Sequence, residues 1–343
     1  MSIILGIHED LIKHANGEVQ SFSQRWIELA TERGIEVKVV DAKMKNVLEE
    51  LSRCSGFLWR FGYSPLELEL SKRLIQSVEH GIGIPVFPCV KSTWHFEDKI
   101  AQYYLLTAIN CPIPDTRVLW SEGAALNYCD SAAYPFVLKL SSGIQSRNVK
   151  LVENRKQAKL LIDLIFKSGV TTLEDSRSTL ARKLGRLALP IKLLLGSHLP
   201  RGLQTGYFLV QEFLPENSFD TRITVVGNRA FGFRRMNRTG DFRASGSGVI
   251  DWNPELIDPG AIRLAFKVAE QLQTDSLAID ILYKGTVPVV AEISYTYASW
   301  AVAKCPGHWV HTRESIEKLS WVHGSLRPED AIFEDFLHKI NEA

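Results

Sequence analysis

Apolar and polar positions in the first ninety residues follow two alternating repeats. Four continuous apolar runs predict buried strands, at 2–7, 35–40, 57–60 and 84–87. Between these runs, apolar residues recur at helical spacing and predict helices, at 20–33, 45–53 and 66–80. Strands that alternate with helices in this order predict a doubly wound parallel sheet.

After residue 94, the predicted strands and helices no longer alternate one by one. We expect further helices, at 96–109, 153–167, 258–273 and 328–340. We expect further strands, at 116–120, 136–140, 149–152, 207–214, 222–226, 230–235, 278–283 and 287–293. Residues 168–205 are basic and helix-leaning, and we interpret them as an insertion. The sequence therefore predicts an α/β protein whose C-terminal part is of the α+β type.

Composition narrows the class of protein. The chain has 343 residues, and 40 Lys and Arg against 39 Asp and Glu give a net charge of +1, which argues against nucleic-acid binding. A hydrophobic content of 45% excludes a disordered chain. Five widely spaced cysteines without a C-x-x-C pair indicate reduced thiols. No signal-peptide pattern precedes the first strand, and no apolar run approaches the ~18 residues that span a bilayer. We therefore expect a cytoplasmic protein that does not contact a membrane.

Two carboxylates lie in apolar strands near the C-terminal end of the chain. SLAIDILYKGTVPVVAEIS predicts a hairpin, and with residues 284–286 as the loop Asp280 pairs with Val290. Glu292 and Ser294 then share the face of Asp280. Because an unpaired buried charge is costly, both carboxylates need cations. A Mg²⁺ ion satisfies both, and separate arginine partners are the alternative.

Six arginines between residues 220 and 243 form a local basic cluster. Guanidinium groups match the geometry of phosphate and carboxylate groups, and Arg222 is a candidate for such a contact. Arg234 and Arg235 face opposite ways on one strand, so only one of them can point into a site. We interpret Arg229 and Arg238 as solvated.

Two loops of small residues offer backbone N–H groups to an anion. One follows the strand that ends at Lys139, and the other follows the arginine cluster. Neither is a Walker A motif, because no G-K-[ST] opens a helix. Their candidate residues are Ser141, Ser142 and Gly143 in the first loop, and Ser245 and Gly246 in the second.

Polar side chains follow the first and third predicted strands. They are His8, Arg60 and Tyr63. Ligands of doubly wound sheets bind beyond the carboxyl ends of the strands, so these residues could contact a polar, anionic substrate. A solvated loop is an equally weighted interpretation. A dinucleotide fingerprint is absent, because the first strand lacks G-x-G-x-x-G.

Five motifs, in this order, resemble the ATP-grasp superfamily in the branch of glutathione synthases and ribosomal protein S6 modification ligases. They are FEDK (96–99), YPFVLKLSSGIQSRNVKLV (134–152), VQEFL (210–214), DTRITVVGNRAFGFRRMNRTGDFRASGSG (220–248) and AIDILY…VVAEIS (278–294). The resemblance implies an ATP-grasp fold preceded by a small doubly wound domain. The implied domains are 1–94, 95–212 with the insertion near 168–205, and 213–343.

The resemblance also implies roles for single residues. Lys99 and Lys139 correspond to lysines that contact ATP phosphates, residues 141–149 to a phosphate-covering loop, and Asp220 to a carboxylate that holds the ribose hydroxyls. The hinge whose backbone reads adenine corresponds to Gln211, Glu212, Phe213 and Leu214. The arginines that hold the γ-phosphate and the acyl phosphate correspond to Arg234 or Arg235, and Arg243.

The metal ligands implied by the resemblance agree with the strand pattern. Asp280 and Glu292 correspond to the Mg²⁺ ligands, whereas Ser294 stands where the family usually has Asn. The phosphate loop is also poorer in glycine than is usual. The serine leaves one or two Mg²⁺ ions open, and neither departure removes the two carboxylates or the lysines.

The implied activity is ATP- and Mg²⁺-dependent joining of a carboxylate to an amine through an acyl phosphate. The implied substrates are an amino acid, a peptide or a sugar-linked acid, and a homodimer is a further expectation from the family. A kinase on the same fold and a non-catalytic ATP-binding scaffold are alternatives. A metal hydrolase built on His308 and His311 is disfavoured, because an isolated H-x-x-H pair is more often structural.

Overall fold

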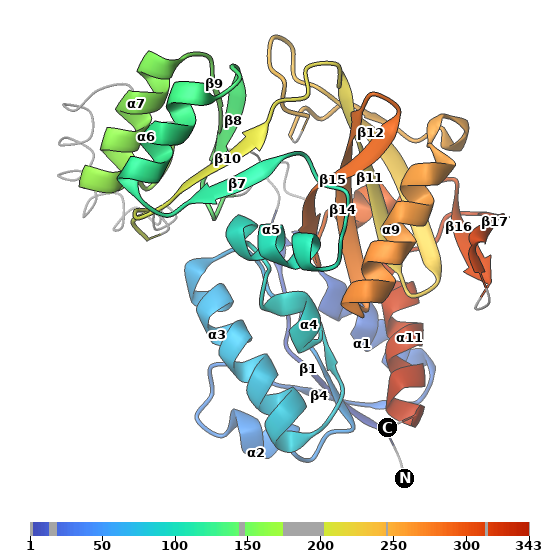
Figure 1. Ribbon diagram of the computed structural model, residues 1–343. Coiled ribbons are helices and arrows are strands. Elements are labelled where there is room, and N and C mark those ends of the chain that lie inside the picture. Colours follow the sequence, from blue (N-terminus) through green and yellow to red (C-terminus); the bar gives the residue numbers. More distant parts are fainter. Residues whose placement is uncertain are drawn as a thin grey trace.

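Three larger β-sheets and one two-stranded ribbon organise the part of the chain that the structure describes (Figure 1). The computed structural model describes residues 3–13, 19–143, 148–173, 202–244, 246–312 and 315–342. A parallel sheet is formed by the first ninety residues, an antiparallel sheet by residues 116–212, and a larger antiparallel sheet by residues 219–323. This arrangement confirms the predicted fold class.

The first sheet is parallel, with strand order β4-β1-β5-β6, as the alternating pattern predicts. Its strands are β1 (Ile4–Ile7), β4 (Glu36–Val39), β5 (Gly56–Leu58) and β6 (Val86–Phe87). Its helices are α1 (Phe22–Glu32), α2 (Val47–Leu51), α3 (Pro65–Gln76), which continues as a π-helical turn (Ser77–Ile82), and α4 (Val90–Thr93). A two-stranded ribbon, β2 (Ile12–Lys13) with β3 (Val19–Gln20), follows β1.

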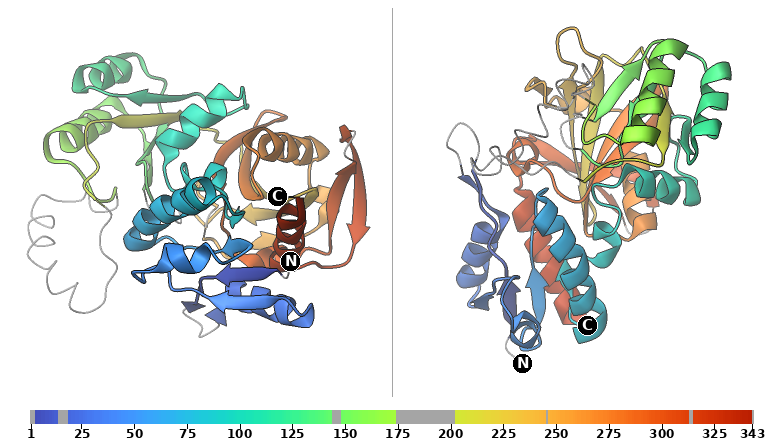
Figure 2. Two further views of the ribbon diagram at one scale, coloured as in Figure 1. Left: turned by 90° about the horizontal axis from the view of Figure 1, so that it is seen from below. Right: turned by 90° about the vertical axis from the view of Figure 1, so that its left-hand side faces the viewer.

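The last helix of the chain returns to this first sheet. Helix α11 (Pro328–Glu342) packs against α1 (Figure 2). Arg25 of α1 binds both oxygens of Asp330, at 2.8 and 3.0 Å, and the Trp26 indole donates to the Glu329 carbonyl at 3.1 Å. The two ends of the chain therefore stabilise one another.

The second sheet has strand order β7-β10-β8-β9 and is antiparallel. Its strands are β7 (Thr116–Leu119), β8 (Phe136–Lys139), β9 (Val149–Val152) and β10 (Phe208–Glu212). Helices α6 (Glu122–Ser131) and α7 (Arg155–Asp163), the latter continued by a π-helical turn (Leu164–Ser168), lie beside it. The sequence pattern missed α6, because the helix buries only Ala125 and Cys129 and so has no continuous apolar stripe.

The third sheet has strand order β15-β14-β11-β12-β16-β17, with β13 paired to β12. Its strands are β11 (Phe219–Val226), β12 (Arg229–Met236), β13 (Ile250–Asp251), β14 (Ser276–Lys284), β15 (Val287–Ser294), β16 (Gly307–Thr312) and β17 (Ser315–His323). The helices near it are α5 (Lys99–Ala108), a 3-10 turn (Pro254–Leu256), α9 (Pro259–Leu272) and α10 (Ser299–Ala303). The β16–β17 hairpin was not predicted.

The register of the β14–β15 hairpin corrects the predicted one. Lys284 pairs with Val287, so the turn has two residues, and Gly285 adopts φ 61° there. A β-bulge follows Asp280, and this carboxylate pairs with Glu292 instead of Val290. The shorter turn and the bulge therefore place Asp280 and Glu292 directly opposite each other.

All five cysteines are buried free thiols. This agrees with the expectation of reduced cysteines. Within the described parts of the chain, none of the helices has the length and apolar character needed to cross a bilayer.

Candidate functional site

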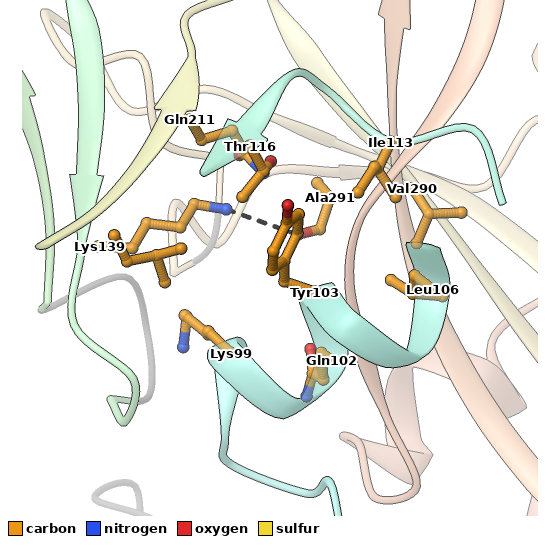
Figure 3. A pocket seen from close by; sticks show the side chains of 11 residues that line it. Lys99, Gln102, Tyr103, Leu106, Ile113, Thr116, Lys139, Gln211, Val290 and Ala291 are labelled. Carbon is orange, nitrogen blue, oxygen red and sulfur yellow. Dashed lines mark hydrogen bonds between the residues drawn. The ribbon is translucent and has the colours of Figure 1, made fainter. Parts of the chain in front are cut away.

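A cleft lies where the second and third sheets meet (Figure 3). Helix α5 and strands β7, β8, β10 and β15 contribute its walls, and it holds about 370 Å³ of empty space, open solvent included. The lining residues are Lys99, Gln102, Tyr103, Leu106, Ile113, Thr116, Lys139, Leu209, Gln211, Val290 and Ala291. Three predicted nucleotide-binding residues, Lys99, Lys139 and Gln211, thus line one cleft.

The FEDK segment places Lys99 at the start of α5. Asp98 caps the helix by accepting from the backbone N–H groups of Ile100 and Ala101, at 3.1 and 3.0 Å. The Lys99 ammonium lies 3.0 Å from Glu292 Oε1 and 3.1 Å from the Gly143 carbonyl. One ammonium therefore connects the candidate metal ligand with the candidate phosphate loop.

Lys139, the last residue of β8, is enclosed near the same carboxylates. Its ammonium lies 3.5 Å from the Ala291 carbonyl. The pKa of Lys139 is lowered to about 8, because the effect of burial, with a smaller one from the charge of Lys99, outweighs the opposing effects of Glu292 and Asp280. A bound anion would therefore raise the pKa of Lys139 and favour its ammonium form.

Asp280 is held by two arginines. Arg222 donates to both of its oxygens, at 2.7 and 2.8 Å, and Arg235 lies 2.8 Å from one of them. Burial alone would raise the pKa of Asp280, but the two guanidinium groups outweigh it and hold the pKa below its usual value. For this residue the arrangement is the arginine pairing that the sequence left as the alternative.

Asp220 completes the same cluster. Its oxygens accept from Arg235 at 2.7 and 2.6 Å, because β11 and β12 place the two residues opposite each other. Burial raises the pKa of Asp220, and neighbouring Asp280 adds to the effect. Both Asp220 oxygens are engaged by Arg235 and only 8% of the residue is exposed, and the ribose contact of Asp220 stays a prediction.

Asp280 and Glu292 are suited to bind a cation together with phosphate oxygens, rather than to bind the cation by themselves. Among the described residues, no group of three or more His, Cys, Asp or Glu side chains is arranged to hold a metal ion. Asp280 and Glu292 nevertheless face each other across two strands, and the side chain of Glu292 is 36% exposed. Carboxylate oxygens suit Mg²⁺, which is commonly held by one or two of them together with phosphate oxygens.

Ser294, the third predicted metal ligand, lies two residues beyond Glu292 on β15. Its hydroxyl donates to the Thr296 carbonyl at 2.7 Å. The Ser294 hydroxyl also forms a side-chain hydrogen bond with Tyr63.

The structure separates Arg235 from Arg234. Arg235 points into the cluster, whereas the Arg234 guanidinium stacks on Phe219 at 4.4 Å and contacts the Leu256 carbonyl. Of the two candidates, Arg235 therefore faces the site. Arg243 binds Asp241 with its guanidinium, at 2.6 to 3.0 Å.

The second small-residue loop is described only in part. Ser245 lies outside the described residues. Gly246 has φ 78°, and a side chain there would meet Arg238 at 2.8 Å. The positive φ favours glycine at this position, since the Arg238 side chain could move aside.

The start of the first small-residue loop is held by neighbouring segments. The Ser141 hydroxyl donates to Asp98 at 2.8 Å, and its N–H donates to the Tyr207 hydroxyl at 2.7 Å. The Ser142 carbonyl accepts from Asn148, and the Gly143 N–H donates to Glu97 at 3.3 Å. Residues 144–147 lie outside the described residues.

Only one side chain of the predicted hinge lines the cleft, that of Gln211. Glu212 instead binds Lys284 at 2.8 Å. Phe213 packs edge-on against Phe242. The Leu214 carbonyl accepts from Asn217 at 3.3 Å.

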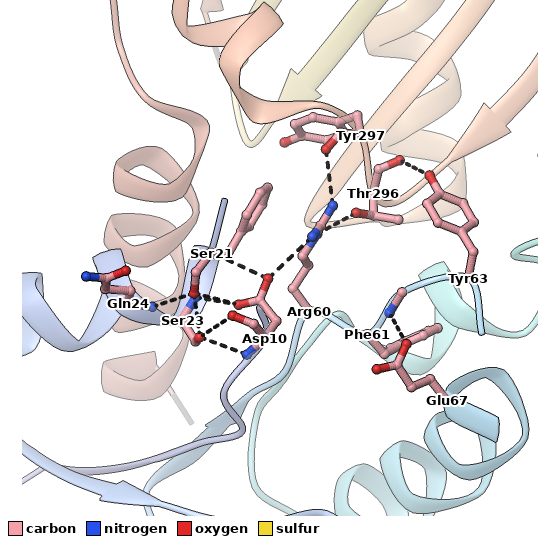
Figure 4. A network of polar contacts seen from close by, with 12 residues as sticks. Asp10, Ser21, Ser23, Gln24, Arg60, Phe61, Tyr63, Glu67, Thr296 and Tyr297 are labelled. Carbon is pink, nitrogen blue, oxygen red and sulfur yellow. Dashed lines mark hydrogen bonds and ion pairs between the residues drawn. The ribbon is translucent and has the colours of Figure 1, made fainter. Parts of the chain in front are cut away.

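The predicted substrate residues of the first domain lie in a buried network (Figure 4). Arg60 is 4% exposed; it donates to the Thr296 hydroxyl at 2.8 Å and lies 3.4 Å from Asp10 and from the Tyr297 carbonyl. Tyr63 donates to the Thr296 carbonyl at 3.4 Å. A solvated loop is therefore wrong for Arg60, which ties the first sheet to the segment after β15.

The three histidines considered in the sequence, His8, His308 and His311, contact backbone atoms or aromatic rings close to them. His8 Nδ1 lies 2.9 Å from the Val40 carbonyl and 3.2 Å from the Ala42 N–H nitrogen. His308 and His311 pack on Phe231 and Phe266, respectively, and do not form a pair. This agrees with the structural interpretation of the H-x-x-H pattern.

Sequence reasoning missed several cleft residues on α5. Gln102 and Tyr103 line the cleft together with Lys99, and both Gln102 amide atoms bond the Ile293 backbone next to Glu292, at 2.9 and 3.3 Å. Their spacing of three and four residues from Lys99 places them on one helical face. That spacing is the sequence signal that could have revealed them.

Comparisons with known proteins agree with this architecture. Residues 196–302 match the model of the RimK-like ATP-grasp domain. Ribosomal protein bS6–L-glutamate ligase of Salmonella paratyphi B is 25% identical over 237 residues, which are 68% of this chain and 65% of the relative. The aligned region thus spans slightly less than two thirds of that relative.

Two solved structures share the fold over nearly the whole chain. A RimK domain ATP-grasp protein from Sphaerobacter thermophilus has a TM-score of 0.55 and 18% identity, covering 98% of this chain and 99% of its own. D-alanine–D-alanine ligase from Bacillus anthracis, complexed with ATP, has a TM-score of 0.56 and 14% identity, covering 100% and 99%.

Proposed function

We propose that the chain is an ATP- and Mg²⁺-dependent carboxylate–amine ligase of the ATP-grasp superfamily, because residues 196–302 match the RimK-like ATP-grasp domain and the fold resembles that of an ATP-grasp protein. The observation that carries the proposal is the cleft between two sheets that Lys99 and Lys139 line, together with the carboxylates next to it. Glu292 lies 3.0 Å from Lys99, and Asp280, which pairs with Glu292 across two strands, is held by Arg235. The proposed domains are 1–94, 95–212 and 213–343. The buried reduced thiols suit a cytoplasmic location.

The proposed reaction has two steps. A substrate carboxylate oxygen attacks the γ-phosphorus of ATP, the bond from this phosphorus to the β,γ-bridging oxygen breaks, and ADP leaves. The amine nitrogen then attacks the acyl carbon, the carbon–oxygen bond to phosphate breaks, and an amide and inorganic phosphate form. The nitrogen loses a proton in this step. Phosphoryl transfer depends chiefly on positioning and on charge stabilisation, which side chains can supply.

The side chains of the cluster have distinct proposed tasks. Lys99 and Lys139 bind the phosphates, and Arg235 stabilises charge on the transferring group. Mg²⁺ would be held by Glu292 and Asp280, with Ser294 as a neutral oxygen, and when bound it neutralises phosphate charge. Arg222 keeps Asp280 ionised and oriented. Arg243 is proposed to hold the acyl phosphate, and the backbone N–H groups at Ser245 and Gly246 are proposed to hold the oxyanion of the tetrahedral intermediate.

The substrates are proposed as classes. The named activities of the similar proteins join L-glutamate to a ribosomal protein and D-alanine to D-alanine. For this chain we propose an amino acid or peptide as the amine and a small-molecule or peptide carboxylate as the acid. The first domain contributes through Arg60, which positions the segment after β15.

We expect nucleotide binding to take up a proton near pH 8. The pKa of Lys139 is about 8 in the free protein, and a bound phosphate raises it by favouring the ammonium form. Between pH 8 and the higher pKa of the complex, binding therefore protonates Lys139, and affinity falls as the pH rises. Calorimetric titration with Mg-ATP in buffers of different ionisation enthalpy measures this uptake. Equal uptake by Lys139→Arg, whose guanidinium stays protonated, would assign it to another group.

The activity is tested by measuring ADP and phosphate release with Mg-ATP across amino acids, peptides and uronic acids, each with and without an amine. A ligase releases ADP and phosphate in equal amounts, and its full rate needs both an acid and an amine. ADP release with a hydroxyl compound and without free phosphate would instead identify a kinase. Binding of Mg-ATP without turnover by any pair would favour the scaffold.

A further inference from the structure

We propose that Tyr207 and Gln204 are positioning residues that hold the base of the phosphate loop in place for the phosphates of a bound nucleotide. The described residues that form this loop base are Ser141, Ser142, Gly143 and Asn148. Gln204 lies in the predicted insertion, 168–205, so the inference gives one end of the insertion a part in nucleotide binding. It rests on the proposed function.

The Tyr207 hydroxyl lies between the loop base and the insertion. It accepts from the backbone N–H of Ser141 at 2.7 Å and donates to Gln204 Oε1 at 2.5 Å. Because a backbone N–H can only donate, the hydroxyl oxygen accepts there and its proton remains for Gln204. Tyr207 is buried, and burial raises the pKa of this residue to about 12, so the hydroxyl keeps its proton at neutral pH. One buried hydroxyl therefore joins the first residue of the loop base to the insertion.

Gln204 is itself fixed where the two described ends of the insertion meet. Its backbone pairs with that of Val170 in both directions, at 2.9 and 2.7 Å. Since its side-chain oxygen accepts from Tyr207, its Nε2 group donates to other acceptors, the Ser142 hydroxyl at 3.4 Å and the Gly202 carbonyl at 3.2 Å. Gln204 therefore holds the loop base twice, once through Tyr207 and once through Ser142.

The other end of the insertion supports the loop base through Asn148. The Asn148 amide donates to the Ser142 carbonyl at 2.6 Å, and its oxygen accepts from the Leu173 N–H at 3.3 Å. Asn148 also fills the space beside Gly143, where an added Cβ would lie 2.8 Å from the Asn148 side chain. Gly143 adopts φ 144°, so its backbone as well as its surroundings favour glycine. Both ends of the insertion thus contact the base of the phosphate loop.

The loop base in turn contacts a lysine that is proposed to bind phosphates. The Ser141 carbonyl accepts from the Lys99 backbone N–H at 2.8 Å, and the Gly143 carbonyl lies 3.1 Å from the Lys99 ammonium. Displacement of the loop base would therefore disturb the position of this ammonium. Tyr207 thus acts on the phosphates through Ser141 and Lys99.

Calorimetric titration with ATP and with AMP, both in the presence of Mg²⁺, tests this role. AMP lacks the β- and γ-phosphates. In Tyr207→Phe the Ser141 N–H loses its acceptor, and the nucleotide has to fix the loop base as it binds, so we expect the affinity for ATP to fall about tenfold. The affinity for AMP should change by less than about twofold, because the ring of the variant still fills its place. A merely structural role would weaken the binding of both nucleotides alike.

A second variant tests whether Tyr207 acts together with Gln204. Gln204→Leu removes the acceptor of the Tyr207 hydroxyl and should lower the affinity for ATP by a similar factor. Because both substitutions break one chain of hydrogen bonds, the double variant should bind ATP about as weakly as either single variant. Additive losses in the double variant would overturn the connection between the insertion and the loop base. Gln204 is more exposed than Tyr207, so Gln204→Leu keeps the test decisive should Tyr207→Phe fail to fold.

Tyr134→Phe is the matched control. The Tyr134 hydroxyl lies beside the same sheet but donates to the Cys129 carbonyl at 2.9 Å, so this variant should bind both nucleotides as the wild-type protein does. Thermal unfolding establishes that each variant is folded. Wild-type affinity for ATP in folded Tyr207→Phe, or equal weakening of ATP and AMP, overturns this inference and leaves the proposed function standing. A wild-type protein that does not bind ATP overturns both.

Discussion

Asp280→Ala is expected to lower the free energy of unfolding by about 3–5 kcal/mol, because it leaves two buried guanidinium groups without their shared carboxylate. Arg222 and Arg235 approach Asp280 to 2.7 and 2.8 Å, and the side chain is 13% exposed. Asp220 alone would then face both arginines. Chemical denaturation followed by tryptophan fluorescence measures the loss.

A surface pair provides the control for this stability effect. Glu49 binds Arg53 at 2.7 Å, but both side chains are more than half exposed. Glu49→Ala should therefore change the stability little, since solvent screens such pairs. Equal effects of Asp280→Ala and Glu49→Ala would mean that the cluster does not hold the sheet together.

The same ion pairs predict how acid affects the fold. The pKa of Asp280 lies below its usual value in the folded protein, so this residue stabilises the fold fully above its unfolded pKa. The contribution is lost as the pH falls through the folded pKa. Burial raises the pKa of Asp220 in the folded protein, so ionisation of this residue lowers the stability as the pH rises through its unfolded pKa.

Glu292→Gln is expected to reduce turnover of Mg-ATP by at least about 100-fold while leaving the fold intact. The substitution removes the more exposed carboxylate of the cluster, and metal stabilisation of phosphoryl transfer is worth several kcal/mol. It also removes the partner of Lys99, but the ammonium keeps the Gly143 carbonyl. ADP release and thermal unfolding are measured on the same preparation.

Asp275→Asn is the matched control for that variant. Asp275 is 26% exposed and binds Lys339 at 3.2 Å, whereas Glu292 binds Lys99, which lines the cleft. This substitution should leave turnover near the wild-type value. Turnover by Glu292→Gln equal to that of Asp275→Asn would remove Glu292 from the metal site.

Local pattern was sufficient to predict the first sheet and the chemistry of the β14–β15 hairpin. Continuous apolar runs define buried parallel strands, and charged residues in such strands stand out against them. The partner of each charge was not predictable, because it depends on register. A two-residue turn and one bulge decide that Asp280 faces Glu292, and neither is visible in the alternation of residues.

Long-range packing accounts for the other differences. Arg60 has the composition of a loop residue, yet the segment after β15 covers it and supplies its partners, Thr296 and the Tyr297 carbonyl. Likewise Gln211 was predicted for its backbone, whereas its side chain lines the cleft through pairing with β7. Contacts between segments about a hundred or more residues apart leave no periodic trace in the sequence.

The fate of the carboxylate oxygen tests the proposed ligase most directly. The acid that supports the highest ADP release is labelled with ¹⁸O in its carboxylate, and the inorganic phosphate is examined by mass spectrometry after turnover with amine. Attack on the γ-phosphorus followed by amide formation predicts one ¹⁸O atom in each phosphate. Phosphate whose new oxygen comes only from water would show that ATP is hydrolysed directly, and would contradict the acyl phosphate.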